Sequence, residues 1–147
     1  MEGNVRASVQ KDIDLIVEAG LREQDQVELN AMDADVRSAL EHGIAHSSPS
    51  CLTVTVNSLP AAMFGVVPVQ PRCGLVWLLG TDDILKVSTQ FLRESKSWLG
   101  HISKEYDLVG NVVHESNSVS IRWLKWLGFT FLGKQGPFIE FVRTNNV

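Results

Sequence analysis

The side chains that most often carry out chemistry, histidine and cysteine, are sparse and scattered in this chain. His42 and His46 are four residues apart, so on a helix they would share one face as a metal-binding pair. No third ligand lies near them in the sequence, and a solvated helix face is the better interpretation. Cys51 and Cys73 show neither metal nor redox spacing, and nothing in the sequence pairs either thiol with a histidine base. We therefore expect no metal site and two buried, unreactive thiols.

The most informative stretch is 117–129, NSVSIRWLKWLGF, which predicts a short capped helix. The Asn117 side chain can accept a hydrogen bond from the amides of the first helical turn. Gly128 suits the left-handed position that ends a helix. The apolar residues fall at helical spacing on one face: Val119, Trp123, Leu124 and Leu127. The helix is therefore expected to pack on a core and to lead directly into a strand at 130–132.

The rest of the chain alternates between strand and helix patterns that must position this stretch. Predicted strands cover 5–9, 51–56, 59–69, 74–79, 108–113, 130–132 and 137–142. Predicted helices cover 12–32, weakened at Gly20, then 34–46 and 81–105. The continuously apolar strand 74–79 is expected to be central and buried on both faces. The order indicates a mixed α/β or α+β fold, with one sheet of six to seven strands flanked by about four helices.

Composition limits the classes of protein that this chain can belong to. Its 147 residues are 44% apolar and 20% charged, which is typical of one globular domain over 1–147. The net charge is −4 with no cluster of basic residues, so we expect no nucleic-acid partner. The longest apolar run, near 75–79, is too short to span a bilayer. The first residues lack the pattern of a signal peptide, so a cytoplasmic location is expected.

Three stretches of the sequence resemble the GNAT acyltransferase fold. Residues 117–129 resemble its last helix, written N-x-x-[AS]-[IR]-x-[FL]-Y-x-x-x-G-F, and residues 5–13, VRASVQKDI, resemble the opening pattern R-x-[AST]-x-x-x-D-[IL]. Residues 54–66 look like the second and third strands of the family. A strand, Gly80-Thr81-Asp82, a long helix and a further strand resemble one branch more closely, the phage-encoded GNAT-like family called internal virion protein A.

The resemblance implies acetyl-CoA as a cofactor, although no cofactor is certain from the residues. In the family, a glycine-rich loop after the fourth strand presents backbone amides to the pyrophosphate. Here the segment 79–86 has one glycine and two aspartates, which oppose phosphate binding, and Lys86 is the nearest counter-charge. If acetyl-CoA binds, the implied contacts are Trp77, Leu78, Leu79, Thr81, Asp82, Lys86, Asn117 and Ser120. The amides of 81–84 would then bind phosphate, and splayed strands at 77–79 and 108–110 would hold the pantetheine.

Acid–base residues are equally scarce in the positions that the resemblance marks. Leu124 stands where the enzymes usually carry a tyrosine that is proposed as general acid, and Tyr106 lies at the end of the long helix. Four residues are candidate stand-ins: Glu23, Glu28, Glu115 and Ser120. Solvated surface charges are the better interpretation of the glutamates. Capping is the better interpretation of Asn117 and Ser120.

These observations favour a phage GNAT-fold protein with a degenerate acyl-CoA site. It would act in virion assembly or through contacts with other phage virion proteins or a host protein, in the infected host cytoplasm or in the virion. The alternative is an active N-acetyltransferase that transfers an acetyl group to an amine of a protein or small molecule. A third hypothesis is a small protein that binds and inhibits a host factor. The sequence leaves a homo-oligomer open.

Overall fold

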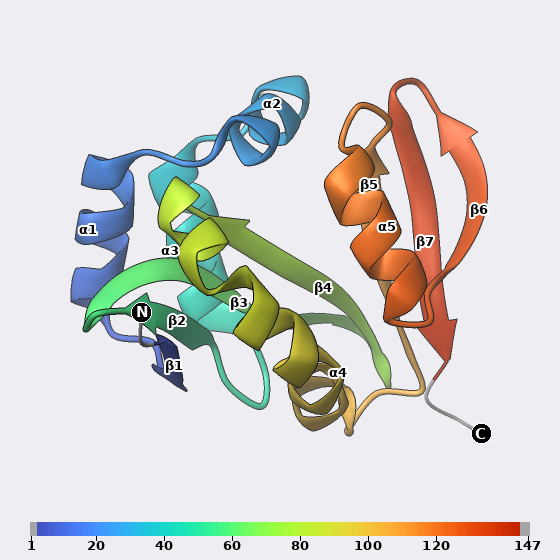
Figure 1. Cartoon of the computed structure of the whole chain (residues 1–147). Coiled ribbons are helices and arrows are strands. Elements are labelled where there is room, and N and C mark those ends of the chain that lie inside the picture. The colour runs from blue at the N-terminus through green and yellow to red at the C-terminus, as the bar shows by residue number, and fades with distance from the viewer. Residues whose placement is uncertain (1–2, 145–147) are drawn as a thin grey trace.

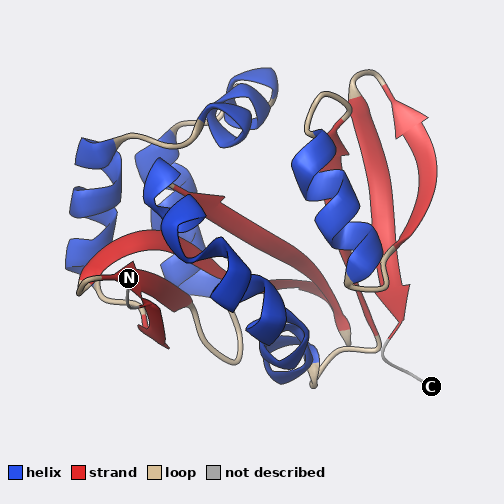
Figure 2. Cartoon of the chain, viewed as in Figure 1, coloured by secondary structure: helices blue, strands red, loops and turns tan. Residues whose placement is uncertain are grey.

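A seven-stranded sheet forms the centre of the fold, with helices packed against it (Figures 1 and 2). The structure is a computed structural model and describes residues 3–144. The strand order is β1-β2-β3-β4-β5-β7-β6, and only the β4–β5 pair is parallel. The elements are β1 (Gly3–Ala7), α1 (Gln10–Ala19), α2 (Glu23–Ala31), α3 (Val36–His46), β2 (Leu52–Val56), β3 (Leu59–Gln70), β4 (Cys73–Gly80), η1 (Asp82–Val87), α4 (Ser88–Ser103), β5 (Leu108–His114), α5 (Ser118–Trp126), β6 (Thr130–Gln135) and β7 (Phe138–Thr144). The mixed architecture and the predicted strand number are confirmed.

Alternating side chains of the central strands build a separate core on each face of the sheet. Trp77 and Leu79 of β4 pack with the smaller cluster, whose buried members from α1 and α3 are Ile13, Ile16 and Leu40. Val76 and Leu78 of β4 pack with the larger cluster under α4 and α5. This alternation follows from the pleat of a strand, which directs successive side chains to opposite faces.

The helix predicted over 12–32 is divided into two helices. Helix α1 ends at Ala19, and Gly20 follows with φ +85°, a conformation that favours glycine. The chain then turns into α2, so the weak point predicted at Gly20 is a true break. This break allows α2 to run past the end of β4 toward the connection between β5 and α5 (Figure 1).

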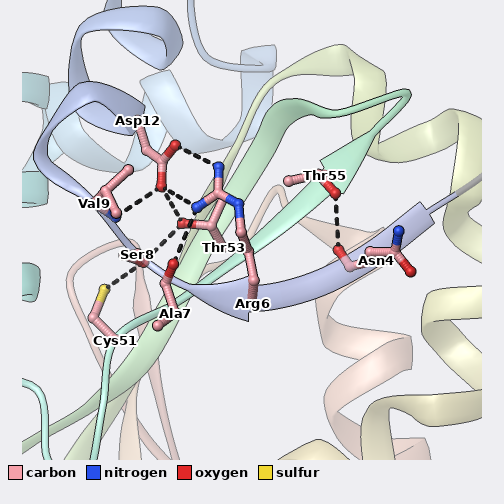
Figure 3. Close-up of polar contacts among 9 residues, drawn as sticks. All are labelled: Asn4, Arg6, Ala7, Ser8, Val9, Asp12, Cys51, Thr53 and Thr55. Carbon is pink, nitrogen blue, oxygen red and sulfur yellow. Dashed lines mark hydrogen bonds and ion pairs between the residues drawn. The ribbon is translucent and has the colours of Figure 1, made fainter.

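An ion pair between the half-exposed Arg6 and the buried Asp12 joins β1 to the start of α1 (Figure 3). The Asp12 carboxylate is almost fully buried and accepts two hydrogen bonds from the Arg6 guanidinium, both 2.8 Å. It also accepts the Val9 N–H at 3.0 Å and the Thr53 hydroxyl at 2.9 Å. The arginine and aspartate of the opening sequence pattern therefore hold the first strand, the first helix and β2 together.

The helix predicted over 81–105 begins with a different geometry. Residues Asp82–Val87 form the 3₁₀ helix η1, and the α-helix α4 starts only at Ser88. The 3₁₀ segment is tighter than an α-helix and keeps its amides close to its own carbonyls. No helix within residues 3–144 is long and apolar enough to cross a membrane.

The parallel strands β4 and β5 pair over a short distance and then separate. Their register covers Cys73↔Leu108, Gly74↔Val109 and Leu75↔Gly110 only. Beyond these pairs, β4 continues to Gly80 and β5 to His114 while the two strands diverge (Figure 1). The splay therefore begins after 108–110, so these residues form its closed end rather than one of its open arms. Strand β4 is half-buried along most of its length, in contrast to the expected burial on both faces, because it has no neighbour along this gap.

Candidate functional site

An open cleft occupies the space between the splayed strands. It has a volume of about 480 Å³ and is lined by residues of α2, α3, β4, α4, β5 and α5. Most of the lining side chains are apolar, with a few polar groups among them, as is usual for small-molecule sites. Side chains from both faces of the sheet line the cleft, so the cleft passes through the gap between β4 and β5 from one face to the other.

Three of the residues expected to contact a cofactor lie along one arm of this cleft: Trp77, Leu78 and Leu79. The Trp77 indole N–H donates to the Ser47 hydroxyl at 2.9 Å, which fixes the ring in the cleft wall. On the opposite arm, the Asn111 amide donates to the Val76 carbonyl at 2.9 Å across the start of the gap. Because backbone groups alternate in direction along a strand, the N–H and C=O of Leu78 point the same way as those of Val76. Strand β4 thus presents polar backbone groups to the cleft.

Asn117 and Glu28 connect the two sides of the cleft mouth. The Asn117 side-chain oxygen accepts the Ser120 N–H at 3.1 Å, so the predicted cap is present. Its Nδ2 donates to Glu28 Oε1 at 2.9 Å, and the same oxygen accepts the His114 N–H at 3.1 Å. The other oxygen, Oε2, has no hydrogen-bond partner among residues 3–144. Glu28 is therefore a positioned carboxylate in the cleft wall, in contrast to the solvated surface charge expected for it.

Burial changes the acid–base behaviour of Glu28. It raises the pKa of the Glu28 carboxyl above its ordinary value of 4.5, although the hydrogen bonds from Asn117 and His114 act in the opposite direction. The nearby Asp25 carboxylate contributes a smaller increase. A carboxylate whose pKa lies closer to neutrality is a better general base than a solvated one. Glu28 was among the candidate acid–base residues, but its contact with Asn117 could not be predicted, because the two residues are 89 positions apart in the chain.

The other acid–base candidates are placed unequally. Ser120 lies in the cleft wall, in the first turn of α5. Glu115 is exposed outside the cleft and forms an ion pair with Lys134, which lowers the pKa of its carboxyl. The Tyr106 hydroxyl donates to the Ser48 carbonyl at 2.9 Å, and Tyr106 does not line the cleft. Leu124 is buried in the cleft wall, so the position of the usual tyrosine is apolar here.

The segment that would hold a pyrophosphate lies outside the cleft, and the amides of Thr81, Asp83 and Ile84 already have partners. Thr81, Asp82 and Lys86 are absent from the described cleft lining. The Thr81 N–H donates to the Ala61 carbonyl at 2.8 Å. The Asp83 and Ile84 N–H groups donate to the Thr81 hydroxyl and carbonyl, both at 3.2 Å. The Lys86 ammonium is 3.0 Å from the Asp83 carboxylate, so the expected counter-charge is also engaged.

The preceding amide, that of Gly80, donates to the buried Asp25 carboxylate of α2. Asp25 Oδ2 accepts the Gly80 N–H at 2.9 Å and the Arg22 Nε–H at 2.8 Å. Asp25 Oδ1 accepts a second hydrogen bond from the same guanidinium at 3.1 Å. Burial raises the pKa of the Asp25 carboxyl, while Arg22 opposes the change. The last amide of β4 is thus bound by the Asp25 carboxylate of α2.

The histidine and cysteine residues form no reactive cluster. The His42 and His46 rings on α3 are in contact, with centroids 4.5 Å apart and planes tilted by 45°. Among residues 3–144, no group of three or more His, Cys, Asp or Glu side chains is arranged to hold a metal ion. Cys51 is buried and accepts a hydrogen bond from the Ser8 hydroxyl at 3.3 Å. Burial raises the pKa of the Cys51 thiol, which keeps it in its less nucleophilic form.

Comparisons with known proteins identify the fold. No protein-family model matches the chain, and no curated protein matches its sequence. A structure from Pyrococcus horikoshii OT3 is similar with a TM-score of 0.76 at 12% identity, over 99% of this chain and 100% of that one. The GNAT domain of S. lividans PAT is similar with a TM-score of 0.71 at 13% identity, over 97% of this chain and 90% of that one. The Campylobacter jejuni N-acetyltransferase PseH in complex with acetyl coenzyme A is similar with a TM-score of 0.64 at 13% identity, over 98% of this chain and 99% of that one. The chain therefore has the GNAT fold.

Proposed function

We propose that this GNAT-fold protein is an N-acyltransferase that uses an acyl thioester, with Glu28 as the general base. The observation that carries the proposal is the Glu28 carboxylate in an open apolar cleft between splayed strands. Burial raises the pKa of the Glu28 carboxyl, which makes its carboxylate a stronger base than a solvated one. The acceptor is a primary amine, because an amine needs only a base that removes its proton in order to attack a thioester.

The transfer balances with the groups present in the cleft. As the amine nitrogen attacks the thioester carbonyl carbon, a C–N bond forms and the nitrogen gives its proton to Glu28 Oε2. The C–S bond breaks, and the sulfur leaves with the electron pair as a thiolate that takes a proton from water. Backbone N–H groups of β4, such as that of Leu78, can donate to the carbonyl oxygen as it gains negative charge.

The buried Leu124 does not prevent this reaction. A thiol has a pKa of about 8.5, so a thiolate leaves without the full assistance of an acid. General acid catalysis contributes about 10²–10⁴-fold where it operates. We therefore expect slower transfer than in an enzyme with a tyrosine at this position, rather than none.

A non-catalytic protein with a degenerate acyl-CoA site, acting in a phage virion or by protein contact, is the second candidate function. It is favoured by one observation: the amides of Gly80, Thr81, Asp83 and Ile84 already donate to acceptors within the protein. The resemblance to internal virion protein A stays a prediction from sequence. The two candidates differ in whether any thioester transfers its acyl group.

The test is an acyl-transfer assay with radiolabelled acetyl-pantetheine and acetyl-CoA and a panel of amines, including polyamines, amino acids and peptides. We expect amine-dependent transfer by the wild type and a loss of about 10²–10³-fold in kcat/KM for Glu28→Gln. The matched control is Glu23→Gln, an exposed glutamate on the same helix, which should leave transfer unchanged. If the wild type transfers no acyl group from either thioester at high protein concentration, the non-catalytic candidate is favoured.

A further inference from the structure

The β4–η1 connection is held by its own hydrogen bonds, which leaves little for a phosphate to bind. The N–H groups of Gly80, Thr81, Asp83 and Ile84 donate to acceptors within the protein, at 2.8 to 3.2 Å. The Gly80 carbonyl accepts the Arg22 N–H at 2.9 Å, so the connection is fixed on both sides. A phosphate could reach these amides only by breaking bonds that attach the connection to β3 and α2.

The charges around this connection also oppose a phosphate. Asp82 is exposed beside the segment, and Asp83 neutralises Lys86 by their 3.0 Å ion pair. Arg22 is the only lysine or arginine among the described residues that line the cleft. It donates two hydrogen bonds to Asp25, at 2.8 and 3.1 Å, and the pair is nearly buried. The cations near the connection are therefore already paired with carboxylates.

The cleft itself offers the opposite environment. Trp77, Trp98 and Trp123 belong to its largely apolar wall, and the Leu78 backbone adds hydrogen-bonding groups along the gap. The Asn111 side chain is already engaged, because it donates to the Val76 carbonyl and accepts the Val112 N–H. A pantetheine arm, a narrow chain with two amides and apolar segments between them, matches a lining of this kind. Binding energy is therefore available to the thioester end of a donor and not to a diphosphate at the β4–η1 connection.

We infer, on the basis of the proposed acyl transfer, that the acyl donor is recognised through its acyl-pantetheine arm alone and that a diphosphate adds nothing to its binding. The donors are acyl-pantetheine thioesters in general, and the protein does not prefer acyl-CoA over the other members of this class. The two aspartates of η1 cause this selectivity. Lys86 offsets only one of them, so the connection keeps a net negative charge that repels a diphosphate and leaves a neutral arm unaffected.

The experiment compares acetyl-pantetheine with acetyl-CoA, both by calorimetric Kd and by kcat/KM, at low ionic strength. We expect the Kd of acetyl-pantetheine to be at most about threefold higher than that of acetyl-CoA. This corresponds to less than about 0.7 kcal/mol in binding free energy. Acetyl-CoA binding tenfold or more tightly would overturn the inference and leave the proposed function intact. If neither thioester binds, the proposed function fails and the inference fails with it.

A charge variant tests the reason for the selectivity. The double substitution Asp82→Asn/Asp83→Asn also releases Lys86 from its ion pair. We expect it to strengthen acetyl-CoA binding by about three- to tenfold and to leave acetyl-pantetheine binding unchanged. Equal effects on both ligands, or none on either, would overturn the role of the two aspartates. Adding 0.5 M salt should reduce the difference between wild type and variant, because exposed charges are screened.

Discussion

The substitution Asp12→Asn should destabilise the protein through the ion pair that joins β1 to α1. In the wild type, Oδ2 accepts the Val9 N–H, the Thr53 hydroxyl and one Arg6 N–H, and Oδ1 accepts the second Arg6 N–H. An asparagine oxygen at the Oδ2 position keeps the first three bonds. The new NH₂ group then faces the Arg6 guanidinium, so one charge-assisted bond is lost.

The magnitude follows from the exposure of the two partners. A hydrogen bond to a charged group contributes about 1.5–3 kcal/mol. The Arg6 side chain is 42% exposed and can recover water, whereas the Asp12 side chain is only 2% exposed. We therefore expect a loss near the lower end, about 1.5–2 kcal/mol in the free energy of unfolding at pH 7. The control is Asp14→Asn in the same helix, whose pair with Arg37 is exposed on both sides and should contribute about 0.5 kcal/mol or less.

The pH dependence gives the second measure of the same pair. Burial alone would raise the pKa of the Asp12 carboxyl, but the hydrogen bonds from Arg6, Val9 and Thr53 outweigh it and hold the pKa below its ordinary value of 3.8. A lowered pKa in the folded state means that the stabilisation is complete above pH 3.8 and is lost as the pH falls through the folded pKa. The difference between wild type and Asp12→Asn should therefore be constant from pH 5 to 8 and decrease below about pH 4.

The assay is urea unfolding followed by tryptophan fluorescence, at pH 7 and at steps down to the lowest pH where the wild type is folded. The reasoning would be refuted by a loss below 0.5 kcal/mol at pH 7. A difference that does not change below pH 4 would also contradict it, because the contribution would then be independent of the carboxylate charge.

Three further predictions concern the cleft. Glu28→Gln should change the free energy of unfolding by less than about 0.5 kcal/mol, because one oxygen accepts both hydrogen bonds, whereas Glu28→Ala should cost about 1–3 kcal/mol in urea unfolding; equal losses would contradict this geometry. The kcat/KM for acyl transfer should rise with pH through a pKa above 4.5, and this limb should disappear in Glu28→Gln; a limb at or below 4.5 would exclude Glu28 as the base. Gly43→Ala should lower the free energy of unfolding by about 1–3 kcal/mol and shift tryptophan emission, since its Cβ would lie 2.3 Å from the Trp77 ring. The control Gly100→Ala has open space around it and should stabilise α4 by about 0.5–1 kcal/mol. Equal effects of the two variants would show that Trp77 moves freely.

Local patterns were sufficient to predict most of the elements. The strand and helix periods, the break at Gly20 and the Asn117 cap depend on residues within one or two turns of each other, so they can be read from the sequence. The prediction for α5 was wrong in one detail, because Val119 is 51% exposed instead of facing the core. The helix predicted over 81–105 was correct in extent, but its first turns form the 3₁₀ helix η1.

The candidate site depends on contacts between residues that are far apart in the chain. Glu28 and Asn117 are 89 residues apart, and Asp25 and Gly80 are 55 apart. The sequence alone predicted the scaffold and a segment unsuited to phosphate binding, because Asp82 and Asp83 oppose a phosphate wherever the segment lies. Only the tertiary structure decided that β4 and β5 stay open and that Glu28 faces the opening. The physical reason is that burial, and with it the pKa of a carboxylate, is set by the segments that pack around it and not by its neighbours in sequence.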